Sequence, residues 1–562
     1  MLGAMPTAWL ARASFLCLAL AACTRPADRG KRAGGCAGEY CGTLVFAAVG
    51  EPETLLPPLV ESATARDVSD QLFLRLADIG LSSNTIGDED FTPALARRWQ
   101  WEGPLTLVFH LDPRARWQDG QPLTAADVVF TYDAYTDVRV NAANRNGLRG
   151  IAAVTPRDSF TVVFRFKRRY PEMFYDAVFQ MRILPGHLLR DIPRAQWQTA
   201  AFARAPTGDG PYRFVSWKAG EHFELAADST FFLGRPHLRR LIWRFTPDLQ
   251  VAVTQLVAGE VDAVETLGSP DNIRRAASAP AVATYPYRGS AYGYLGFNLR
   301  AAGDTARPHP LFADRDVRRA LAMAVDREKL LKSVWGDHAA VPRGPGSQLW
   351  WTWDPETRDL PYDTAQAARL LTARGWIDSD HDGVRDRRGR KFSFRLLVPT
   401  TSGVRRAYAR LLQEQLRGLG VEALIDEVEF SVFTPRERAG AFDAIIQTWN
   451  TDPTPSSSLT QTWTRAGIGN SNFGRYVSPP FEQLVQQASA SFDRAQARQR
   501  WRRALELLNQ DAPAVFLFAP ENVAAVHTRV ANVTIRPDSW WALVRTWRIP
   551  PERLIDRDRL ER

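Results

Sequence analysis

Alternating apolar and polar positions predict strands in the first third of the chain. A period of two runs through residues 105–111 and again through 160–166, which is typical of half-buried strands. Between these runs, Thr124 precedes Asp127 by three residues, close to a capping box, and predicts a helix as far as about Tyr135. Together these elements indicate a small α+β lobe.

The pattern changes to helices that alternate with strands after about residue 300. Val317, Leu321, Val325 and Leu330 form one apolar stripe, which predicts a single helix. Further helices are predicted at 363–375, 405–418 and within 481–509, and strands at 421–425, 442–449 and 514–518. Such alternation favours a mixed or parallel sheet. The tail 525–547 is predicted to be strand-rich and to return to the first lobe, because an isolated strand would leave backbone groups unpaired.

One predicted strand ends in polar and aromatic residues for which the local sequence gives no structural reason. FDAIIQTWNTDPTPSSS, residues 442–458, begins with a buried strand and then reads as a loop with no helix to cap. Trp449, Asn450 and Asp452 lie where the strand ends, with no obvious charge partner nearby. One interpretation is an Asp-Pro turn in which Asp452 bonds its own backbone and Trp449 packs in the core. The other is that the ring and the carboxylate face a binding cleft.

Length and composition indicate a globular chain of more than one unit. With 562 residues, 45% hydrophobic and 24% charged, we expect two or three lobes. The net charge of +9 comes from arginines spread along the chain, which favours solvated faces over a nucleic-acid interface. Some of the 18 tryptophans belong in cores, but amphipathic rings also line binding clefts.

The N-terminus has the features of an export signal. Arg12 precedes an apolar stretch, 13–22, that is too short to span a bilayer and ends at Leu20-Ala21-Ala22-Cys23. This ending resembles a bacterial lipobox, in which Cys23 is acylated and anchors the protein to a membrane surface. The alternative is a plain secretory signal. We therefore predict a signal peptide over 1–22, and no stretch after it approaches the apolar length of a membrane span.

A flexible tether is predicted over 23–42, rich in Gly, Ala, Arg and Pro. Cys36 and Cys41 lie inside it and can form a small disulfide loop outside the cytoplasm. No cysteine follows Cys41, so the folded body must be held together by its core.

The motifs that would indicate an enzyme or a cofactor are missing. The sequence has no G-x-S-x-G, H-E-x-x-H or G-x-x-x-x-G-K pattern, and its eight histidines are scattered. The segment 378–386 resembles a calcium loop, but Gly389 stands where a bidentate glutamate should close the site, so a polar turn is the preferred interpretation and no metal is predicted.

Several stretches, in order, resemble one family. They are TPALARRWQWEGPLTLVFHLDPRARWQDGQPLTAADVVFTYD, GDGPYRFVSWKAGEHFEL, LVAGEVDAV, YLGFNLR, FADRDVRRALAMAVDREKL and ARGWIDSDHDGVRDRRGRKFSFRLLVP. From about residue 43 nearly to the C-terminus, the chain is similar to extracellular solute-binding proteins of family 5, the binding components of oligopeptide and dipeptide ABC importers.

The resemblance implies a bilobal periplasmic-binding-protein-like fold, mixed α/β, with the ligand cleft between the lobes. Lobe I is then discontinuous, made of 43–58, 207–292 and 517–562, and carries an inserted subdomain over 59–206. Lobe II spans 293–516. Two crossings, near 293–299 and 516–520, would act as the hinge at which a few residues absorb the dihedral change.

The resemblance also implies site residues. A Trp-x-x-Asp at the end of a second-lobe strand matches Trp449, Asn450 and Asp452, and would place Asp452 against the ammonium of a peptide. Glu51 matches a glutamate beside the peptide backbone, with a solvated loop acid as the alternative. Tyr292 and Trp463 are further cleft candidates, with core packing as the alternative.

The function implied is capture of a short peptide or similar solute outside the cytoplasm and its delivery to an ABC permease. The alternatives are a solute-sensing lipoprotein and a binder of a nickel complex or an oligosaccharide; a hydrolase is the least favoured. We expect a lipid-anchored monomer on the periplasmic or cell-surface face of a bacterial membrane, without nucleic acid or cofactor.

Overall fold

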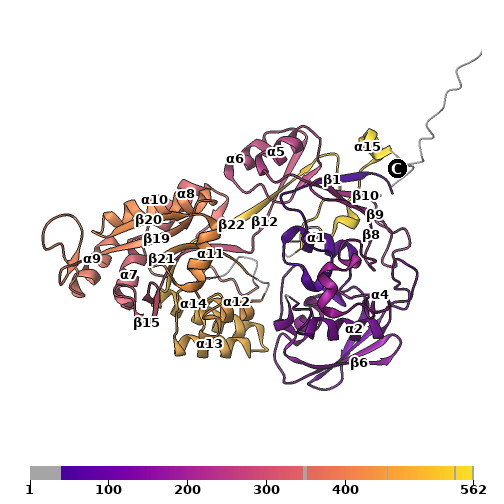
Figure 1. The fold of residues 1–562 in the computed structure, drawn as a ribbon, viewed down its shortest axis with the longest axis horizontal. Helices are drawn as coiled ribbons and strands as arrows, with labels where there is room; N and C mark the ends of the chain where they lie inside the picture. The colour runs from indigo at the N-terminus through magenta and orange to yellow at the C-terminus, as the bar shows by residue number, and fades with distance from the viewer. Residues whose placement is uncertain (1–39, 143, 346–350, 452–453, 537–538, 560–562) are drawn as a thin grey trace, which may run out of the picture.

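The fold consists of two lobes joined by crossing strands, as Figure 1 shows. The structure is a computed structural model that describes residues 40–142, 144–345, 351–451, 454–536 and 539–559. Helices α7 to α14 gather in one lobe, while α1, α2, α4 and strands β6 and β8 to β10 lie in the other.

The predicted signal peptide, Cys23 and Cys36 fall outside the described residues. Cys41 is buried and disulfide-bonded.

One twelve-stranded sheet runs through both lobes. Ten strands follow one another in the order β20-β19-β21-β13-β22-β11-β1-β10-β9-β8, and β12 and β16 pair with β22 beside this path. Their bounds are β1 (Thr43–Ala48), β8 (Tyr212–Lys218), β9 (His222–Ala227), β10 (Arg240–Phe245), β11 (Ala263–Val264), β12 (Val282–Arg288), β13 (Ala291–Phe297), β16 (Ala339–Ala340), β19 (Ser393–Pro399), β20 (Glu422–Val428), β21 (Ala444–Asn450) and β22 (Ala514–His527).

Strand β22 connects the two lobes. Its first residues pair with β13 and its last with β12 and β11, while Ala519 and Pro520 between them pair with β16. The prediction of a short strand at 514–518 followed by a strand-rich tail is wrong. The strand has 14 residues, and the described residues beyond it contribute one isolated bridge, Ala531 with Arg548.

A second, smaller sheet builds the inserted subdomain. Its order is β4-β5-β7-β6, with bounds β4 (Ala96–Trp101), β5 (Thr106–Leu111), β6 (Ile151–Asp158) and β7 (Thr161–Phe166). Helix α2 (Ala125–Thr136) packs against it and begins with the predicted capping box of Thr124 and Asp127, so this local prediction is confirmed. The remaining elements here are α1 (Ala63–Leu72), β2 (Ala77–Ile79), β3 (Phe91–Pro93), α3 (Met173–Phe179) and α4 (Gly186–Leu189).

The single helix predicted from one apolar stripe is two helices, α7 (Arg315–Ala324) and α8 (Arg327–Trp335). Val325 is extended, with φ −97° and ψ 112°, and the Asp326 carboxylate accepts from the backbone of Lys329 to start α8. The stripe spans both helices because its residues share one core cluster. The other helices of this lobe are α9 (Thr364–Ala373), α10 (Gly403–Arg417), α11 (Phe430–Ala439), α12 (Pro455–Trp463), α13 (Pro479–Ser489) and α14 (Arg494–Asp511).

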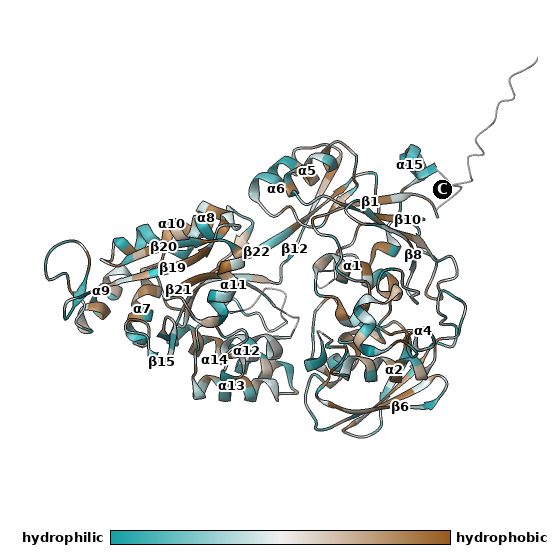
Figure 2. Ribbon diagram, viewed as in Figure 1, coloured by the Kyte–Doolittle hydropathy of each residue, from teal (hydrophilic) through white to brown (hydrophobic). Residues whose placement is uncertain are grey.

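Separate hydrophobic cores fill the lobes. In Figure 2, β19 and β21 are hydrophobic under the helices that cover them, whereas α15 (Asp556–Arg559) is hydrophilic. Helices α5 (Leu249–Val257) and α6 (Pro270–Ala277) cover a small core of their own. The tail returns to lobe I because Trp541 packs on Phe46, with ring centroids 3.9 Å apart.

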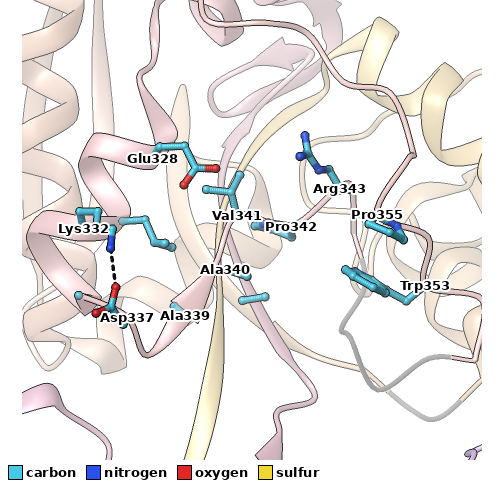
Figure 3. A pocket seen from close by; sticks show the side chains of 13 residues that line it. Glu328, Lys332, Asp337, Ala339, Ala340, Val341, Pro342, Arg343, Trp353 and Pro355 are labelled. Atoms are coloured by element: carbon cyan, nitrogen blue, oxygen red, sulfur yellow. Dashed lines mark hydrogen bonds and ion pairs between the residues drawn. The ribbon is translucent and has the colours of Figure 1, made fainter.

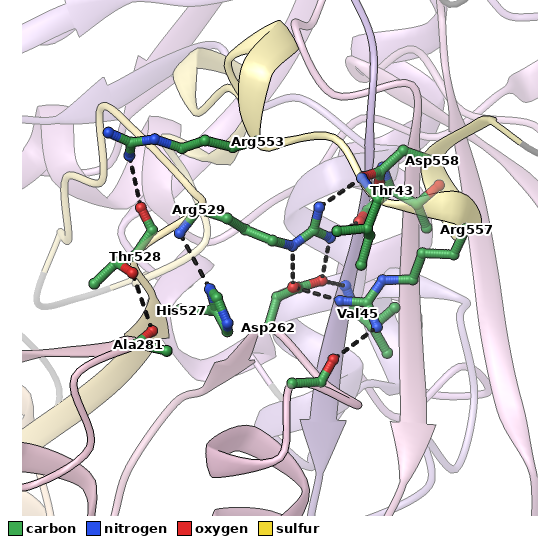
Figure 4. A network of polar contacts seen from close by, with 12 residues as sticks. Thr43, Val45, Asp262, Ala281, His527, Thr528, Arg529, Arg553, Arg557 and Asp558 are labelled. Carbon is green, nitrogen blue, oxygen red and sulfur yellow. Dashed lines mark hydrogen bonds and ion pairs between the residues drawn. The ribbon is translucent and has the colours of Figure 1, made fainter.

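A buried ion network closes lobe I around its first strand (Figure 4). Arg529 donates to Asp262 at 2.6 and 2.9 Å and to Asp558 at 2.7 Å. The two acids also accept from the backbone of Val45 and Thr43 at the start of β1. Burial opposes the charge on Arg529, but the two carboxylates raise its pKa. Segments more than 200 residues apart are thereby fixed to one another.

Replacing Arg529 should therefore destabilise lobe I. In Arg529→Leu two fully buried carboxylates lose the countercharge that they share, although Asp262 keeps its ion pair with Arg557 at 2.5 Å. We therefore expect the free energy of unfolding to fall by about 3–5 kcal/mol. Urea unfolding followed by tryptophan fluorescence measures this. Arg553→Leu is the control, since Arg553 is exposed and should change stability by less than about 0.5 kcal/mol. An equal effect of the two substitutions would contradict the role given to the network.

Candidate functional site

The inserted subdomain and lobe II touch beyond the crossing strands. Ile86, from the loop between β2 and β3, is 7% exposed and packs into the lobe II cluster that holds Tyr292, Leu459 and Trp463. A side chain of one lobe thus enters the core of the other. The surfaces around this contact are the ones that a ligand between the lobes would meet.

A half-buried acid forms the first polar contact across this junction. Glu172, at the start of α3, accepts a 2.7 Å hydrogen bond from the Thr85 hydroxyl and another from the Thr454 hydroxyl of lobe II. Burial raises the pKa of Glu172, and the hydroxyl donors offset part of that shift. Burial and the charge of Glu172 also raise the pKa of Asp176. Within the described residues Glu172 has no ion-pair partner, so this junction is acidic.

Two further contacts join the same surfaces. Arg494 of α14 forms an ion pair with Asp90 at 2.8 Å, and the Arg169 guanidinium lies 4.2 Å from the ring centroid of Phe492. Both contacts are partly exposed, and exposed ion pairs are worth about 1 kcal/mol or less. Contacts of this size hold two lobes together without preventing them from separating.

A cavity of about 510 Å³ lies between the lobes beside these contacts. Its lining comes from the inserted subdomain, from β12 and from lobe II, and consists of Ser82, Asn84, Asp90, Arg288, Trp351, Trp353, Arg494, Ala495 and Arg498. A cavity of this size, lined from both lobes, is suited to a small solute.

Two neighbouring hollows continue the cavity along the crossing strands. One, of about 200 Å³, shares Arg288 with the cavity and reaches Pro520 on β22. The other, of about 380 Å³, shares Trp353 with it and is shown in Figure 3. In that view Lys332 pairs with Asp337 on one side, while Trp353 lies on the other. The hollows therefore follow the hinge strands.

Three of the predicted aromatic residues lie together in lobe II. Tyr292 is 1% exposed and its hydroxyl accepts from Trp463 Nε1 at 3.1 Å. Trp449 lies opposite Tyr292 in the β13–β21 ladder and contacts Phe473 edge-on. In this conformation Tyr292 and Trp463 pack in the core and line none of the three hollows, which matches the packing interpretation of these two residues.

The end of β21 reaches the junction, although the predicted loop after it is wrong. Asn450 is exposed, and Asp452 falls outside the described residues. The segment that read as a loop contains helix α12, with Pro455 in its first turn. The Thr454 hydroxyl does not cap this helix but bonds Glu172 across the junction.

Glu51, another predicted site residue, contacts lobe I and not the junction. Its carboxylate accepts from Trp217 Nε1 at 2.7 Å and from the backbone of Gly220 at 2.9 Å, both in the β8–β9 hairpin of lobe I. The structure therefore does not bring Glu51 together with Trp449.

Sequence reasoning missed the polar residues of the junction. Glu172, Arg288 and Arg498 stand in unrelated segments with no spacing that marks them. Trp351 belongs to a cluster of tryptophans, LWWTWDP, which was the one signal that could have indicated a cleft.

A buried acid supports the strand that leads to Trp449. Glu437 of α11 is 5% exposed and accepts a hydrogen bond from Gln447 on β21. Burial raises the pKa of Glu437 to about 7, although Gln447 and Arg405 counteract it.

The segment that resembles a calcium loop contains its own cation. Asp378, Asp380 and Asp382 bring their carboxylates together, and the Lys391 ammonium pairs with Asp380 at 2.6 Å and with Asp382 at 2.7 Å. These contacts agree with a polar turn.

None of the helices in the described residues combines the length and apolar character that crossing a bilayer requires.

Two lobes, crossing strands and a cavity lined from both sides define a solute-binding protein of the periplasmic type. The model of the family described as bacterial extracellular solute-binding proteins, family 5 Middle, matches residues 90–471. The chain belongs to this family. The predicted fold class, the family and its role as a solute-binding protein, not an enzyme, are confirmed, and the family works outside the cytoplasm.

Known relatives cover nearly the whole chain. The oligopeptide-binding protein AppA of Bacillus subtilis is 28% identical over 546 residues, 94% of this chain and 96% of AppA. Its structure with a nonapeptide gives a TM-score of 0.74 at 25% identity, covering 91% of this chain and 99% of that one. The dipeptide-binding protein of Escherichia coli is 24% identical over 521 residues, 88% of this chain and 92% of that protein. The fold of NikZ from Campylobacter jejuni, solved with Ni(L-His), gives a TM-score of 0.74 at 22% identity, covering 90% and 99%.

The stability of lobe II should depend on pH through Glu437. Because the pKa of Glu437 is raised, the folded chain holds its proton more tightly than the unfolded chain. This stabilisation is complete below the ordinary pKa of 4.5 and is lost as pH rises through about 7. The difference corresponds to about 3 kcal/mol.

Glu437→Gln should remove that part of the pH dependence, which urea unfolding at pH 4.5 and pH 8 measures. Glu429→Gln changes an exposed acid beside the same helix and should follow the parent protein. If Glu437→Gln kept the parent pH profile, the assignment of the shift to Glu437 would be wrong.

Proposed function

We propose that this protein captures short peptides outside the cytoplasm and delivers them to an ABC permease. The observation that carries the proposal is the cavity of about 510 Å³ lined from both lobes, in a chain that aligns over 94% of its length with an oligopeptide-binding protein. Closure of the lobes on the peptide, by rotation at the crossing strands, would present the loaded form to the permease.

Asp452 is proposed to receive the ammonium group of the peptide. Its neighbours support this role: Asn450 ends β21, the Thr451 backbone donates to Ser290 beside the hinge, and Thr454 bonds Glu172 across the junction. An ammonium enclosed between lobes needs a carboxylate, because an unpaired charge out of water is strongly unfavourable. Trp449 and Asn450, directly before this loop, would border the same subsite.

Removing the Asp452 carboxylate should weaken peptide binding. Losing one partner of an enclosed charge pair costs about 3–5 kcal/mol, or between two and four decades of affinity. We expect Asp452→Ala to lose detectable binding in calorimetry against a dipeptide and tripeptide library. Glu552→Gln, a change of an exposed acid near the C-terminus, is the control and should bind as the parent does. Equal binding by Asp452→Ala would eliminate this role.

The protein is further proposed to be a monomer held on the membrane surface by acyl chains on Cys23. The lipobox-like Leu20-Ala21-Ala22-Cys23 supports this, since multiple acyl chains anchor a protein without a spanning helix. The segment 24–42 would then tether the body to the membrane.

Cys23→Ala should release the protein from the membrane. When the full chain is expressed in a bacterium, the parent should be found in the membrane fraction and the variant in the soluble fraction outside the cytoplasm. Mass spectrometry of the N-terminal peptide should find acyl groups only on the parent. An unmodified Cys23 in the mature parent protein would favour the plain secretory signal.

A further inference from the structure

The loop between β2 and β3, residues 80–90, is unusually well buried for a connection of its length. Ser83, Asn84 and Thr85 are each at most 2% exposed, whereas most loops run over the protein surface. Ser83 also has a left-handed backbone, with φ 52°. A residue other than glycine keeps that conformation where the surrounding contacts enforce it. The loop is therefore fixed in shape.

Contacts within the inserted subdomain hold this loop in place. The Asn84 side chain accepts from the backbone of Ile86 at 3.2 Å and donates to the Ile86 carbonyl at 2.7 Å. The backbone of Gly87 donates to the carbonyl of Pro171 at 3.1 Å, directly before Glu172. None of these bonds involves lobe II, so the loop and Glu172 can keep their relative positions when the lobes separate.

Ile86 is the apolar end of the loop. It packs into the lobe II cluster that holds Tyr292, Leu459 and Trp463 and is 7% exposed there. Separation of the lobes would expose apolar surface on both sides, which is unfavourable in water. An apolar side chain on a fixed loop thus fits into the other lobe, and we call residues 80–90 the latch loop.

Glu172 forms the polar part of the same contact and is bonded from both lobes. Its Oε1 accepts from the hydroxyl of Thr85 in the latch loop and from the hydroxyl of Thr454 in lobe II. Ser456 of α12 supplies a third hydroxyl to this carboxyl group. All three partners are neutral, and the two bonds to Oε1 leave Oε2 available to carry a proton.

The charged groups around this carboxylate supply no countercharge. Asp176, one turn along α3, adds a like charge and accepts from the hydroxyl of Tyr170 at 2.7 Å. Arg168 and Arg169 precede Glu172, but their guanidinium groups lie over aromatic rings, 5.7 and 4.2 Å from the centroids. Docking of the latch loop on lobe II therefore removes a carboxylate from water without pairing it among the described residues.

We propose that docking of the latch loop on lobe II takes up a proton at Glu172, so that closure of the lobes responds to pH. The proton comes from the solvent and binds Oε2, and no other bond to Glu172 has to change. This inference rests on the lobe closure of the proposed function and not on the identity of the ligand.

The sign of the effect follows from burial. Burial in the docked arrangement raises the pKa of Glu172 above its ordinary value of 4.5, whereas in separated lobes water would solvate the carboxylate. The docked arrangement thus holds the proton more tightly and is favoured as pH falls. The advantage is lost as pH rises through the raised pKa.

Small-angle scattering of the purified full-length protein, without added ligand, at pH 5, 6, 7 and 8 tests this proposal. Profiles fitted as mixtures of open and docked forms give a closing constant at each pH, and Ile86→Asp, which puts a charge against the lobe II core, gives the open reference. The closing constant of the parent should rise as pH falls, by up to tenfold per pH unit, because one proton is taken up. In Glu172→Gln, which is neutral throughout, it should not change with pH.

Two further variants complete the design. Asp191→Asn changes an exposed acid of the same subdomain and should follow the parent at every pH. Ile86→Ala should lower the closing constant at every pH while keeping its pH dependence, because it shortens the latch side chain and leaves Glu172 unchanged. Thermal unfolding confirms that each variant is folded.

The outcomes separate this proposal from peptide capture. A parent closing constant that does not change with pH, or a Glu172→Gln constant that changes as the parent's does, would overturn the proton uptake. An Ile86→Ala constant equal to that of the parent would overturn the latch. Since no peptide is added, peptide capture can fail while the pH response holds, and the pH response can fail while peptides still bind.

Discussion

The structure depends on one strand that belongs to both lobes. Each half of β22 is fixed in register, one half to β13 and the other to β11 and β12, so the lobes cannot slide past each other. Relative motion must come from dihedral changes between the halves. Pro520 lies there, and it lacks the N–H that would add a ladder bond. Pro520 lines one of the hollows, and Ala519 beside it lines two.

That position couples motion to binding. A rotation at Ala519 and Pro520 would change the shape of the hollows that these residues line and would separate Asp90 from Arg494 further out. The outer contacts are a partly exposed ion pair, a cation–π contact and hydrogen bonds to Glu172, each worth about 1 kcal/mol or slightly more. Contacts of this size would favour the observed arrangement of the lobes only modestly, so a ligand that contacts both lobes would shift the balance between arrangements.

Much of the fold could be predicted because its signals are local. Thr124 with Asp127 before α2 and Asp363 before α9 each indicate the start of a helix by side-chain capping, and the structure has both. The break between α7 and α8 was missed because the apolar stripe continues across it. Only the cap at Asp326 marks the second start.

The errors and omissions have a common physical cause. Helix α12 has a sequence of prolines, serines and threonines that favours a loop, and it is stabilised by Leu459 and Trp463 packing in the core, which is tertiary information. The residues of the junction are likewise brought together only by the tertiary fold. Glu172 and Thr454 are 282 residues apart, and Arg288 and Arg498 line the same cavity from β12 and from α14. The family resemblance pointed to Trp449 and Asp452 as site residues. No spacing in the sequence could have identified the residues that lie near them in the fold.

The charge of Glu172 sets a condition on how the two lobes close. A carboxylate half-buried among hydroxyls, as Glu172 is, has lost part of its hydration without gaining a countercharge from the described residues. Closure is therefore easier when a proton or an incoming cation neutralises it, which agrees with the raised pKa. A ligand that brings a cation to this carboxylate would thus favour closure more than a neutral solute would.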